Sequence, residues 1–471
     1  MATLKPTSCR LRTYQVGFGD CFLLTFRYPP TRAARSRDRH LLIDFGSTHI
    51  PETLRRGLST KVPNHLKEKV KKLKSPITPS RYMTLIAEDI AHASNGKLHA
   101  VVATHRHKDH IDGFKPNASG TAAGNIIASL KPEVVLMPWT EDPNAKPDAR
   151  TATQELSDDE SFVRGLLGMQ ALAGAVAEQM AAMRKALLSR NAPSVRGALQ
   201  LQFLGENNLS NRAAVENLLT MGRRKPRFLS FGKEAGLKTV LPGVDVDVLG
   251  PPTAEQSTAI LNQRRTDPDE FWHLHADFWA IQGETGLAAT GDDDEFFSKD
   301  TTTGLPPMHA RWLASRLDQL NVDQTLQIVR ILDRALNNTS LILLFRAGKK
   351  TLLFPGDAQI ENWLYALTQS SISNAVRRAL ARTDFYKVGH HGSLNATPKS
   401  LWELFEKKST DLTAADRLKS IVSTRSGVHG SPESGTEVPR RKLVAALKKH
   451  SHFASTQDSK KFCFDVEWDL P

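Results

Sequence analysis

Three histidines and an aspartate lie within six positions of one another, at His105, His107, Asp109 and His110. The apolar run directly before them, 98–103, is short and β-branched, which is typical of a buried strand. Residues two apart in an extended chain point to the same side, so His105 and His107 can bind one ion. A strand that ends in nitrogen and oxygen donors predicts a metal site at the edge of a sheet. A polar loop that is merely rich in histidine is the plainer alternative.

Further donors follow other predicted strands, far away in the sequence. Asp357 comes directly after an apolar strand, and the adjacent pair His390 and His391 follows a second one. His429 comes a few residues after a third. A carboxylate delivered in this way can bridge two cations. We therefore expect these side chains to meet the histidine motif at one site, with His429 as an additional contributor.

The types of donor indicate which chemistry the site supports. Mixed imidazole and carboxylate ligands suit zinc best, with manganese or iron as alternatives. Two such ions about 4 Å apart would hold a bridging hydroxide, because a bound ion lowers the pKa of water. They would also neutralise the charge that grows on a phosphoryl or carbonyl oxygen. The sequence has no GxSxG nucleophile elbow and no GxxxxGK[ST] phosphate loop, so metal-dependent hydrolysis is the chemistry it favours.

The strands that present these donors fall into two groups. They are predicted at 10–16, 21–26, 40–46, 98–103, 133–138, 341–345, 350–354, 385–388 and 420–424. Between the groups, Asp158 to Arg190 has a long helical periodicity. We therefore predict two halves of one core, 1–139 and 330–471, with a mainly helical insertion at 140–329.

Composition restricts the class of protein and the kind of partner. The 471 residues are 40% hydrophobic and 24% charged, which is ordinary for a globular protein. The net charge of +13 and the pI of about 9.6 favour an anionic partner such as nucleic acid. Cys9, Cys21 and Cys463 show no CxxC spacing and are typical of reduced intracellular residues. We find no signal segment and no apolar run of the roughly 20 residues that span a bilayer, so a cytoplasmic protein without a membrane role is expected.

The histidine motif has the pattern HxHxDHxxG, from His105 to Gly113, and resembles that of the metallo-β-lactamase fold. Other segments resemble, in the same order, the hydrolase domain of ComEC-like DNA-uptake proteins. They are Val16–Asp20, Leu42–Gly46, Asn338–Ser340, Phe354–Asp357, Lys387–Ser393 and Ser423–Pro432. Together they cover both predicted core halves and not the insertion. The resemblance implies an α/β protein, an αββα sandwich with a dinuclear site between its two sheets.

The resemblance also implies a role for each donor in the first motif and for the aspartate that follows the later strand. His105 and His107 would bind one metal ion, either Zn²⁺ or Mn²⁺. Asp109 and His110 would bind the other, and Asp109 would be required for catalysis. Asp357 would bridge the two ions.

The roles of the later histidines are less closely defined by the resemblance. One of His390 and His391 would complete the second metal, and the other would contact phosphate, since adjacent histidines point to different sides. His391 and His429 are catalytic candidates, with His429 binding phosphate or donating a proton to the leaving oxygen. Many enzymes of the fold have a further histidine before the bridging aspartate, where this chain has Asn337 and Asn338. The first metal would then be one nitrogen ligand short, unless His429 supplies it.

Three functions are compatible with these observations. The first is a metal-dependent phosphodiesterase, in particular a nuclease, whose partner is nucleic acid or another phosphodiester. The second is a hydrolase of a small phosphoester or lactone. The third is a metal-binding subunit of a larger assembly, for example a defence-related one, with residues 140–329 as the surface for a protein partner. The transmembrane channel of the uptake proteins is absent from the chain, so a role in importing DNA is not expected.

Overall fold

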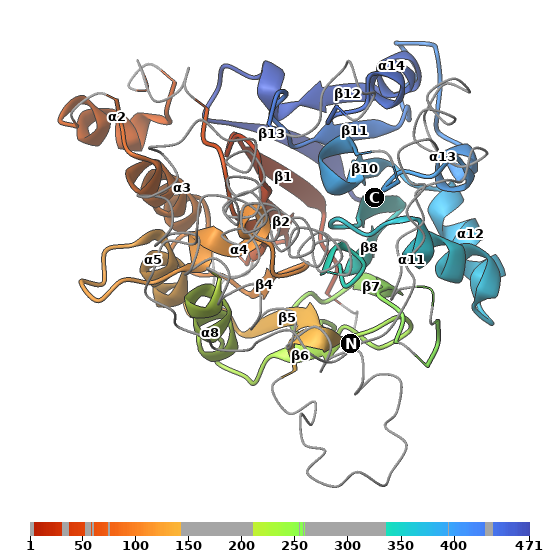
Figure 1. The fold of residues 1–471 in the computed structure, drawn as a ribbon, viewed down its shortest axis with the longest axis horizontal. Coiled ribbons are helices and arrows are strands. Elements are labelled where there is room, and N and C mark those ends of the chain that lie inside the picture. The colour runs from red at the N-terminus through yellow and green to blue at the C-terminus, as the bar shows by residue number, and fades with distance from the viewer. Residues whose placement is uncertain are drawn as a thin grey trace, which may run out of the picture.

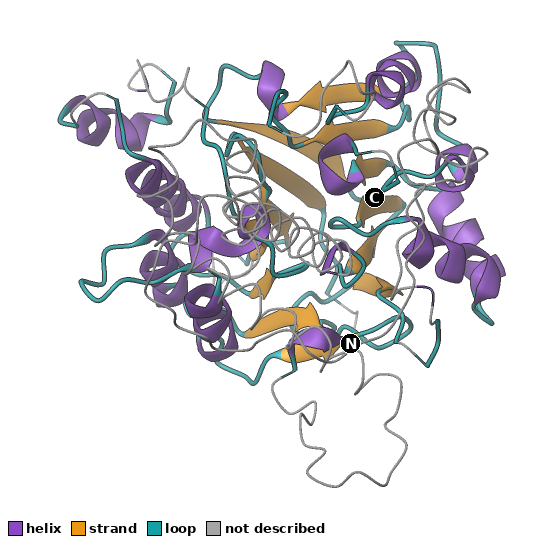
Figure 2. Cartoon of the chain, in the orientation of Figure 1, coloured by secondary structure: helices purple, strands orange, loops and turns teal. Residues whose placement is uncertain are grey.

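A computed structural model gives the structure of the chain. It describes residues 4–30, 37–51, 58, 61–73, 76–142, 211–253, 255–257, 259, 336–393, 395–428 and 437–471. In these residues the chain forms two mixed β-sheets, and helices flank both of them (Figures 1 and 2). The predicted α/β class is therefore confirmed.

The first sheet has seven strands. In spatial order they are β13 (Cys463–Asp469), β1 (Ser8–Tyr14), β2 (Cys21–Arg27), β3 (Arg39–Phe45), β4 (Ala100–Val102), β5 (Val134–Pro138) and β6 (Arg227–Leu229). From β13 to β3 neighbouring strands are antiparallel, and from β3 to β6 they are parallel. The parallel strands all end at the same edge of the sheet, which is where the histidine motif follows β4.

The second sheet has six strands. In spatial order they are β12 (His452–Ser455), β11 (Lys419–Val422), β10 (Phe385–Lys387), β9 (Lys350–Phe354), β8 (Ile342–Ala347) and β7 (Val244–Gly250). The strands from β12 to β9 are parallel, and β9, β8 and β7 are antiparallel neighbours. The segments after β9, β10 and β11 therefore also meet at one edge.

The apolar core lies between the two sheets. Phe22 and Leu24 of β2 point into a cluster to which both sheets contribute. Cys21 and Leu23, the alternate residues, pack under the helices outside the first sheet, as the two-residue period of a strand requires. The ring of Phe22 lies 5.9 Å from that of Phe354 in β9, so the sheets pack directly on each other.

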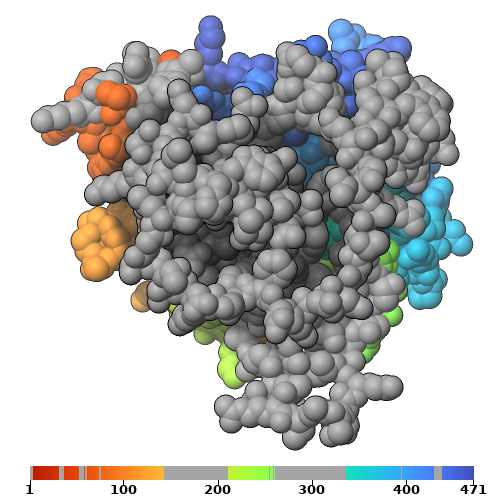
Figure 3. Space-filling view, in the orientation of Figure 1, coloured from red at the N-terminus to blue at the C-terminus, as the bar shows by residue number. Residues whose placement is uncertain are grey.

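Helices cover the outer face of each sheet. Those on the first sheet are α2 (Asn64–Lys71), α3 (Pro79–Ala93), α5 (Ala123–Ser129) and α8 (Arg212–Thr220). Those on the second sheet are α11 (Ile360–Leu364), α12 (Ser373–Ala381), α13 (Lys399–Leu404) and α14 (Arg441–His450). Atoms of α12 lie at the right-hand edge of the space-filling view and those of the C-terminal segment along its upper edge (Figure 3). The layers therefore run helix, sheet, sheet, helix.

Helix α3 illustrates how local sequence sets these elements. Pro79 occupies its first turn, and the hydroxyl of Thr78 accepts a hydrogen bond from the backbone of Arg81 at 3.3 Å. The helix ends before Asn95 and Gly96, both of which have positive φ. The strands predicted at 10–16, 21–26, 341–345 and 350–354 form antiparallel pairs, β1 with β2 and β8 with β9. In the part of the chain that the structure describes, no helix has both the length and the apolar character needed to cross a membrane.

Part of the range predicted as an insertion belongs to the sheets. Strand β6 is an edge strand of the first sheet and β7 is an edge strand of the second. The indole of Trp139, after β5, donates a hydrogen bond of 3.1 Å to the carbonyl of Pro252, after β7, so the two sheets are linked at this point. Most of the predicted helical character, including Asp158 to Arg190, lies outside the described residues.

Candidate metal centre

The histidine motif bends sharply at the end of β4. Helix α4 (Lys108–Ile111) is a single turn that begins after His107 and carries Asp109 and His110. It packs so tightly on the segment after β3 that a Cβ at Gly46 would lie 2.4 Å from the carbonyl carbon of Asp109. Glycine is therefore required at this position for the motif to approach the sheet.

Asp357 is the centre of the cluster. It follows β9, and its Oδ2 lies 3.1 Å from Nε2 of His110 and 3.7 Å from Nε2 of His391. Nε2 of His390 is 3.8 Å away and Nε2 of His105 is 3.9 Å away. One carboxylate oxygen is thus surrounded by four imidazoles that come from both sheets.

A left-handed turn after β10 brings the two adjacent histidines together. His390 has φ 42° and His391 has φ 52°, values that side chains other than glycine rarely adopt. An extended chain would have directed the two rings to opposite sides, but here both reach Asp357. Such conformations cost of order 1–3 kcal/mol and are typical of functional sites. The strained turn thus brings both rings to the same carboxylate.

Hydrogen bonds fix the ring orientations of the two most buried histidines. Nδ1 of His110 is 2.8 Å from Oδ2 of Asp44, and Nδ1 of His391 donates to the carbonyl of Ser423 at 2.7 Å. Their Nε2 atoms are therefore directed at the carboxylates, with Nε2 of His391 2.9 Å from Oδ2 of Asp109. Partners of this kind orient imidazoles that bind metals and make them more basic.

In the metal-free protein, the charges of this cluster balance one another. Burial alone would lower the pKa of His110, but Asp357, Asp44 and Asp109 raise it well above its ordinary value of 6.5. Asp357 and Asp109 shift in the opposite direction. Burial opposes their ionisation, yet His110 is the largest favourable influence on each and holds both pKa values below the ordinary range. Protons on the imidazoles thus supply the positive charge that the carboxylates require.

These residues fit a divalent cation. Asp109, His110, Asp357 and His391 each offer a ligand atom, and the four atoms lie within 4.8 Å of one another. Replacing the imidazole protons by an ion would keep the charge balanced and leave each Nε2 as a donor. Asp109 is the most exposed member, with 13% of its side chain accessible. The cluster can therefore be reached from solvent along Asp109.

A second group of acidic and imidazole side chains adjoins the first and shares His110. Asp20, Asp44 and His110 could also hold an ion. The ammonium of Lys387, however, lies against Asp20 and donates to the carbonyl of Gly356 at 3.2 Å. Only 2% of its side chain is exposed. Burial alone would lower the pKa of Lys387, but Asp20 and Asp357 raise it above the ordinary value, so this group already contains a cation.

His105 and His107 form a pair beside the four-donor set. Nε2 of His105 lies 3.0 Å from Nδ1 of His107, so their side chains meet as the two-residue spacing predicts. The pKa of His105 is held well below its ordinary value, first by burial and then by His110 and His107. A neutral imidazole is the form that binds a metal ion. His105 is therefore already in the state that ligation needs.

The structure brings together seven of the eight side chains predicted from the sequence. They are His105, His107, Asp109, His110, Asp357, His390 and His391. His429, the eighth, lies outside the described residues. Asn338 stands where the family that the sequence resembles often has another histidine. Its Oδ1 accepts a hydrogen bond of 3.1 Å from the side-chain amide of Asn362.

Sequence reasoning missed two residues that this geometry makes important. Lys387 was read only as part of a motif, although a lysine inside an otherwise apolar strand is a signal that could have identified it. Ser423 contributes through its backbone carbonyl, which no side-chain pattern reveals. Asp44 lies within the segment Leu42–Gly46 that carries the resemblance. Its carboxylate lies 2.8 Å from Nδ1 of His110 and accepts hydrogen bonds of 2.7 Å from the backbone and from the hydroxyl of Thr104.

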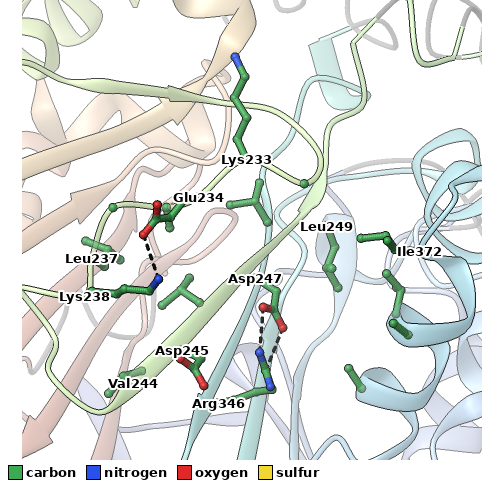
Figure 4. A pocket seen from close by; sticks show the side chains of 18 residues that line it. Lys233, Glu234, Leu237, Lys238, Val244, Asp245, Asp247, Leu249, Arg346 and Ile372 are labelled. Atoms are coloured by element: carbon green, nitrogen blue, oxygen red, sulfur yellow. Dashed lines mark hydrogen bonds and ion pairs between the residues drawn. The ribbon is translucent and has the colours of Figure 1, made fainter. Parts of the chain in front are cut away.

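Two cavities differ in their relation to this centre. One, of about 700 Å³, is lined by α4 and by the segment after β3. The other, of about 490 Å³, lies between β7, residues 232–238 and α12, on the outside of the second sheet (Figure 4). In the second cavity Arg346 pairs with Asp247 at 2.9 Å, and Lys238 pairs with Glu234 at 3.3 Å. Four of the charged side chains drawn in that cavity thus form two ion pairs, whereas Lys233 and Asp245 are drawn without a pair among these residues.

Comparison with known proteins identifies no relative. No protein-family model matches the chain, and no curated protein matches it either. The case for a function therefore depends on the site itself.

Proposed function

We propose that this protein is a metal-dependent phosphodiesterase with a metallo-β-lactamase fold, and that its substrate is nucleic acid. The observation that carries the proposal is the convergence on Asp357 of imidazoles from segments more than 240 residues apart. A buried carboxylate needs a compensating positive charge, and several imidazole Nε2 atoms around one of its oxygens are ligands with which a metal ion can supply that charge.

The arrangement of layers supports the fold proposed. Two mixed sheets pack face to face with helices outside, and the cluster lies where the parallel strands of both sheets end. The segments that contribute to it are those that carry the resemblance: the segment after β3, the histidine motif, and the segments after β9 and β10.

We assign roles to the side chains from their positions. His105 and His107 would hold one ion, Asp109, His110 and His391 the other, and Asp357 both. A bound divalent ion lowers the pKa of water and neutralises charge on a phosphoryl oxygen.

Other residues would position these ligands or contact the substrate. Asp44 and the carbonyl of Ser423 hold the imidazoles of His110 and His391 in position. His390, whose side chain is 27% exposed, would contact the substrate phosphate. Lys387 would keep the deeper carboxylates charged and fixed.

Charge supports an anionic substrate. The protein carries a net charge of +13, which attracts polyanions and makes their binding depend on salt. A neutral lactone would gain nothing from this charge. A polymer of phosphodiesters would gain at every phosphate that it brings near the protein.

The test is hydrolysis by the purified protein supplied with Mn²⁺ or Zn²⁺. Single-stranded DNA, double-stranded DNA, RNA and a bis-aryl phosphodiester form the panel, with small phosphoesters and lactones beside them. We expect cleavage of nucleic acid that Asp109→Ala abolishes. Lys448→Gln, an exposed change on α14, is the control and should retain activity. Cleavage restricted to small esters or lactones, or cleavage that survives Asp109→Ala, would contradict the proposal.

A further inference from the structure

The cavity of about 700 Å³ is a chamber immediately beside the metal centre. Its walls come from the segment after β3, from α4 and the loop that follows it, and from the start of α3. Its polar lining includes Ser47, His49, Lys108, Lys115, Asn117 and Arg425. Ligand sites commonly have volumes of about 300–1,000 Å³, so the chamber is large enough for a nucleotide.

The chain itself connects this cavity to the cluster at three places. Lys108 stands between His107 and Asp109 in the motif. The segment 47–50 continues from Asp44, the partner of His110. Arg425 comes two residues after Ser423, whose carbonyl holds His391. Three parts of the cavity wall are thus direct continuations of segments that build the metal centre.

A single residue separates the cavity from the cluster on one side. The ring of Phe18 lies 4.2 Å from that of His391. The backbone of Phe18 donates to the carbonyl of His49 at 3.0 Å and accepts from the backbone of Thr48 at 2.9 Å. Since Thr48 and His49 line the cavity, its wall is only one residue thick here. The cavity and the cluster therefore lie one residue apart at this point.

The charges in the cavity favour an anion. Among the described residues that line the cavity, three are cationic, namely Lys108, Lys115 and Arg425, and one, Asp112, is acidic. Arg425 is anchored by a hydrogen bond of 2.7 Å from Nη1 to the carbonyl of Ile50. A guanidinium has five N–H donors, more than this bond uses. The side chain is therefore held in place while it keeps donors for a ligand.

We propose that this cavity binds the phosphate that neighbours the scissile one in a nucleic-acid strand. The proposal rests on the proposed function, because the cluster would hold the scissile phosphate. Arg425 supplies the planar donor arrangement that suits phosphate oxygens, and Lys108 and Lys115 supply mobile charge. The enzyme then recognises two consecutive phosphates, which distinguishes a polynucleotide from a small phosphoester.

The test measures binding separately from hydrolysis. A fluorescein-labelled phosphorothioate oligodeoxynucleotide, whose linkages resist cleavage, is titrated with the metal-loaded protein over a range of salt concentrations. We expect Lys115→Gln to weaken binding and to reduce the slope of log affinity against log salt by about one. Arg425→Gln should do the same, and the double variant should reduce the slope by about two. Lys448→Gln removes the same charge from an exposed position on α14 and should leave the slope unchanged.

Each outcome decides one of the two proposals. Equal slopes for wild type, Lys115→Gln and Arg425→Gln, or no binding by the wild type, would overturn the cavity proposal. Lys115 is exposed, so a folding defect cannot account for its effect. Hydrolysis of the ordinary diester oligonucleotide is assayed in parallel. Binding that responds to the cavity variants, without hydrolysis by the wild type, would reject the phosphodiesterase and keep the anion site.

Discussion

Two groups of buried acidic side chains share His110 and take their positive counter-charge from different residues. The outer group is Asp109, His110, Asp357 and His391, and the inner group is Asp20, Asp44 and His110. In the outer group, Asp109 and Asp357 face imidazoles, whose protons an ion can displace. In the inner group, Asp20 faces the ammonium of Lys387, which stays protonated. Both groups contain donors that could hold a cation. The difference teaches that the kind of counter-charge, and not the density of carboxylates, indicates which group is open to a metal ion.

The largest effect should follow from removing the carboxylate at the centre of the outer group. Asp357→Asn removes the negative charge that four imidazoles surround and replaces one of the two carboxylate oxygens by an amide nitrogen. We expect loss of bound metal, measured by elemental analysis. Hydrolysis should fall by at least about 100-fold, which is more than the loss expected from changing a residue that only supports a metal ligand. Retention of stoichiometric metal by this variant would show that the outer group is not the site.

Lys387 tests the inner group. In Lys387→Met the carboxylate of Asp20 becomes a buried charge without its partner, so the free energy of unfolding should fall by about 3–5 kcal/mol. Chemical denaturation measures this. The double variant Asp20→Asn/Lys387→Met should recover part of the loss, because the uncompensated charge is gone. A double variant as unstable as the sum of both single changes would show that the two side chains do not act as a pair.

Asp44 belongs to the inner group and contacts His110, which both groups share, so it tests how the groups are linked. Asp44→Asn keeps the shape of the side chain but weakens its hold on Nδ1 of His110. We expect metal affinity to fall by about 10–100-fold, while the fold is retained. Competition with a fluorescent chelator gives the affinity, and circular dichroism checks the fold. Unchanged affinity would remove Asp44 from the support of the site.

The outer group should respond to pH because a metal ion and protons compete for it. In the metal-free protein the pKa values of His110 and His391 are raised, chiefly by Asp357. Their protons stabilise the fold below the ordinary value of 6.5, and this contribution is lost as pH rises through the raised values. Metal binding must release these protons.

Metal affinity should therefore rise with pH by about tenfold per unit for each proton released. Calorimetry in buffers of different ionisation enthalpy counts the protons. The inner group should show no such dependence on pH, because the raised pKa of Lys387 keeps its ammonium protonated over the pH range in which histidines titrate. A metal affinity that is independent of pH between 6 and 8 (roughly the span in which histidines titrate) would contradict the charge balance described for the outer group.

The sequence was sufficient for the parts of the fold that depend on local pattern. The strand patterns at 10–16, 21–26, 341–345 and 350–354 predicted β1, β2, β8 and β9, and the donors after strand ends predicted which side chains would meet. The left-handed conformation of His390 and His391 could not be predicted, because it depends on contacts with segments distant in the sequence. The role of the Ser423 carbonyl was hidden for the same reason. The extent of the core was also underestimated, since β6 and β7 come from a range that looked like insertion.

The hydrogen bond between Trp139 and the carbonyl of Pro252 links the two sheets outside their apolar interface. Trp139 follows β5 of the first sheet, and Pro252 follows β7 of the second. Because this bond is buried, a displacement of one sheet against the other would leave a polar donor and acceptor unpaired away from water. Sliding of the sheets therefore costs a polar contact as well as apolar packing, and this helps to keep the segments after β4, β9 and β10 in a fixed relative position.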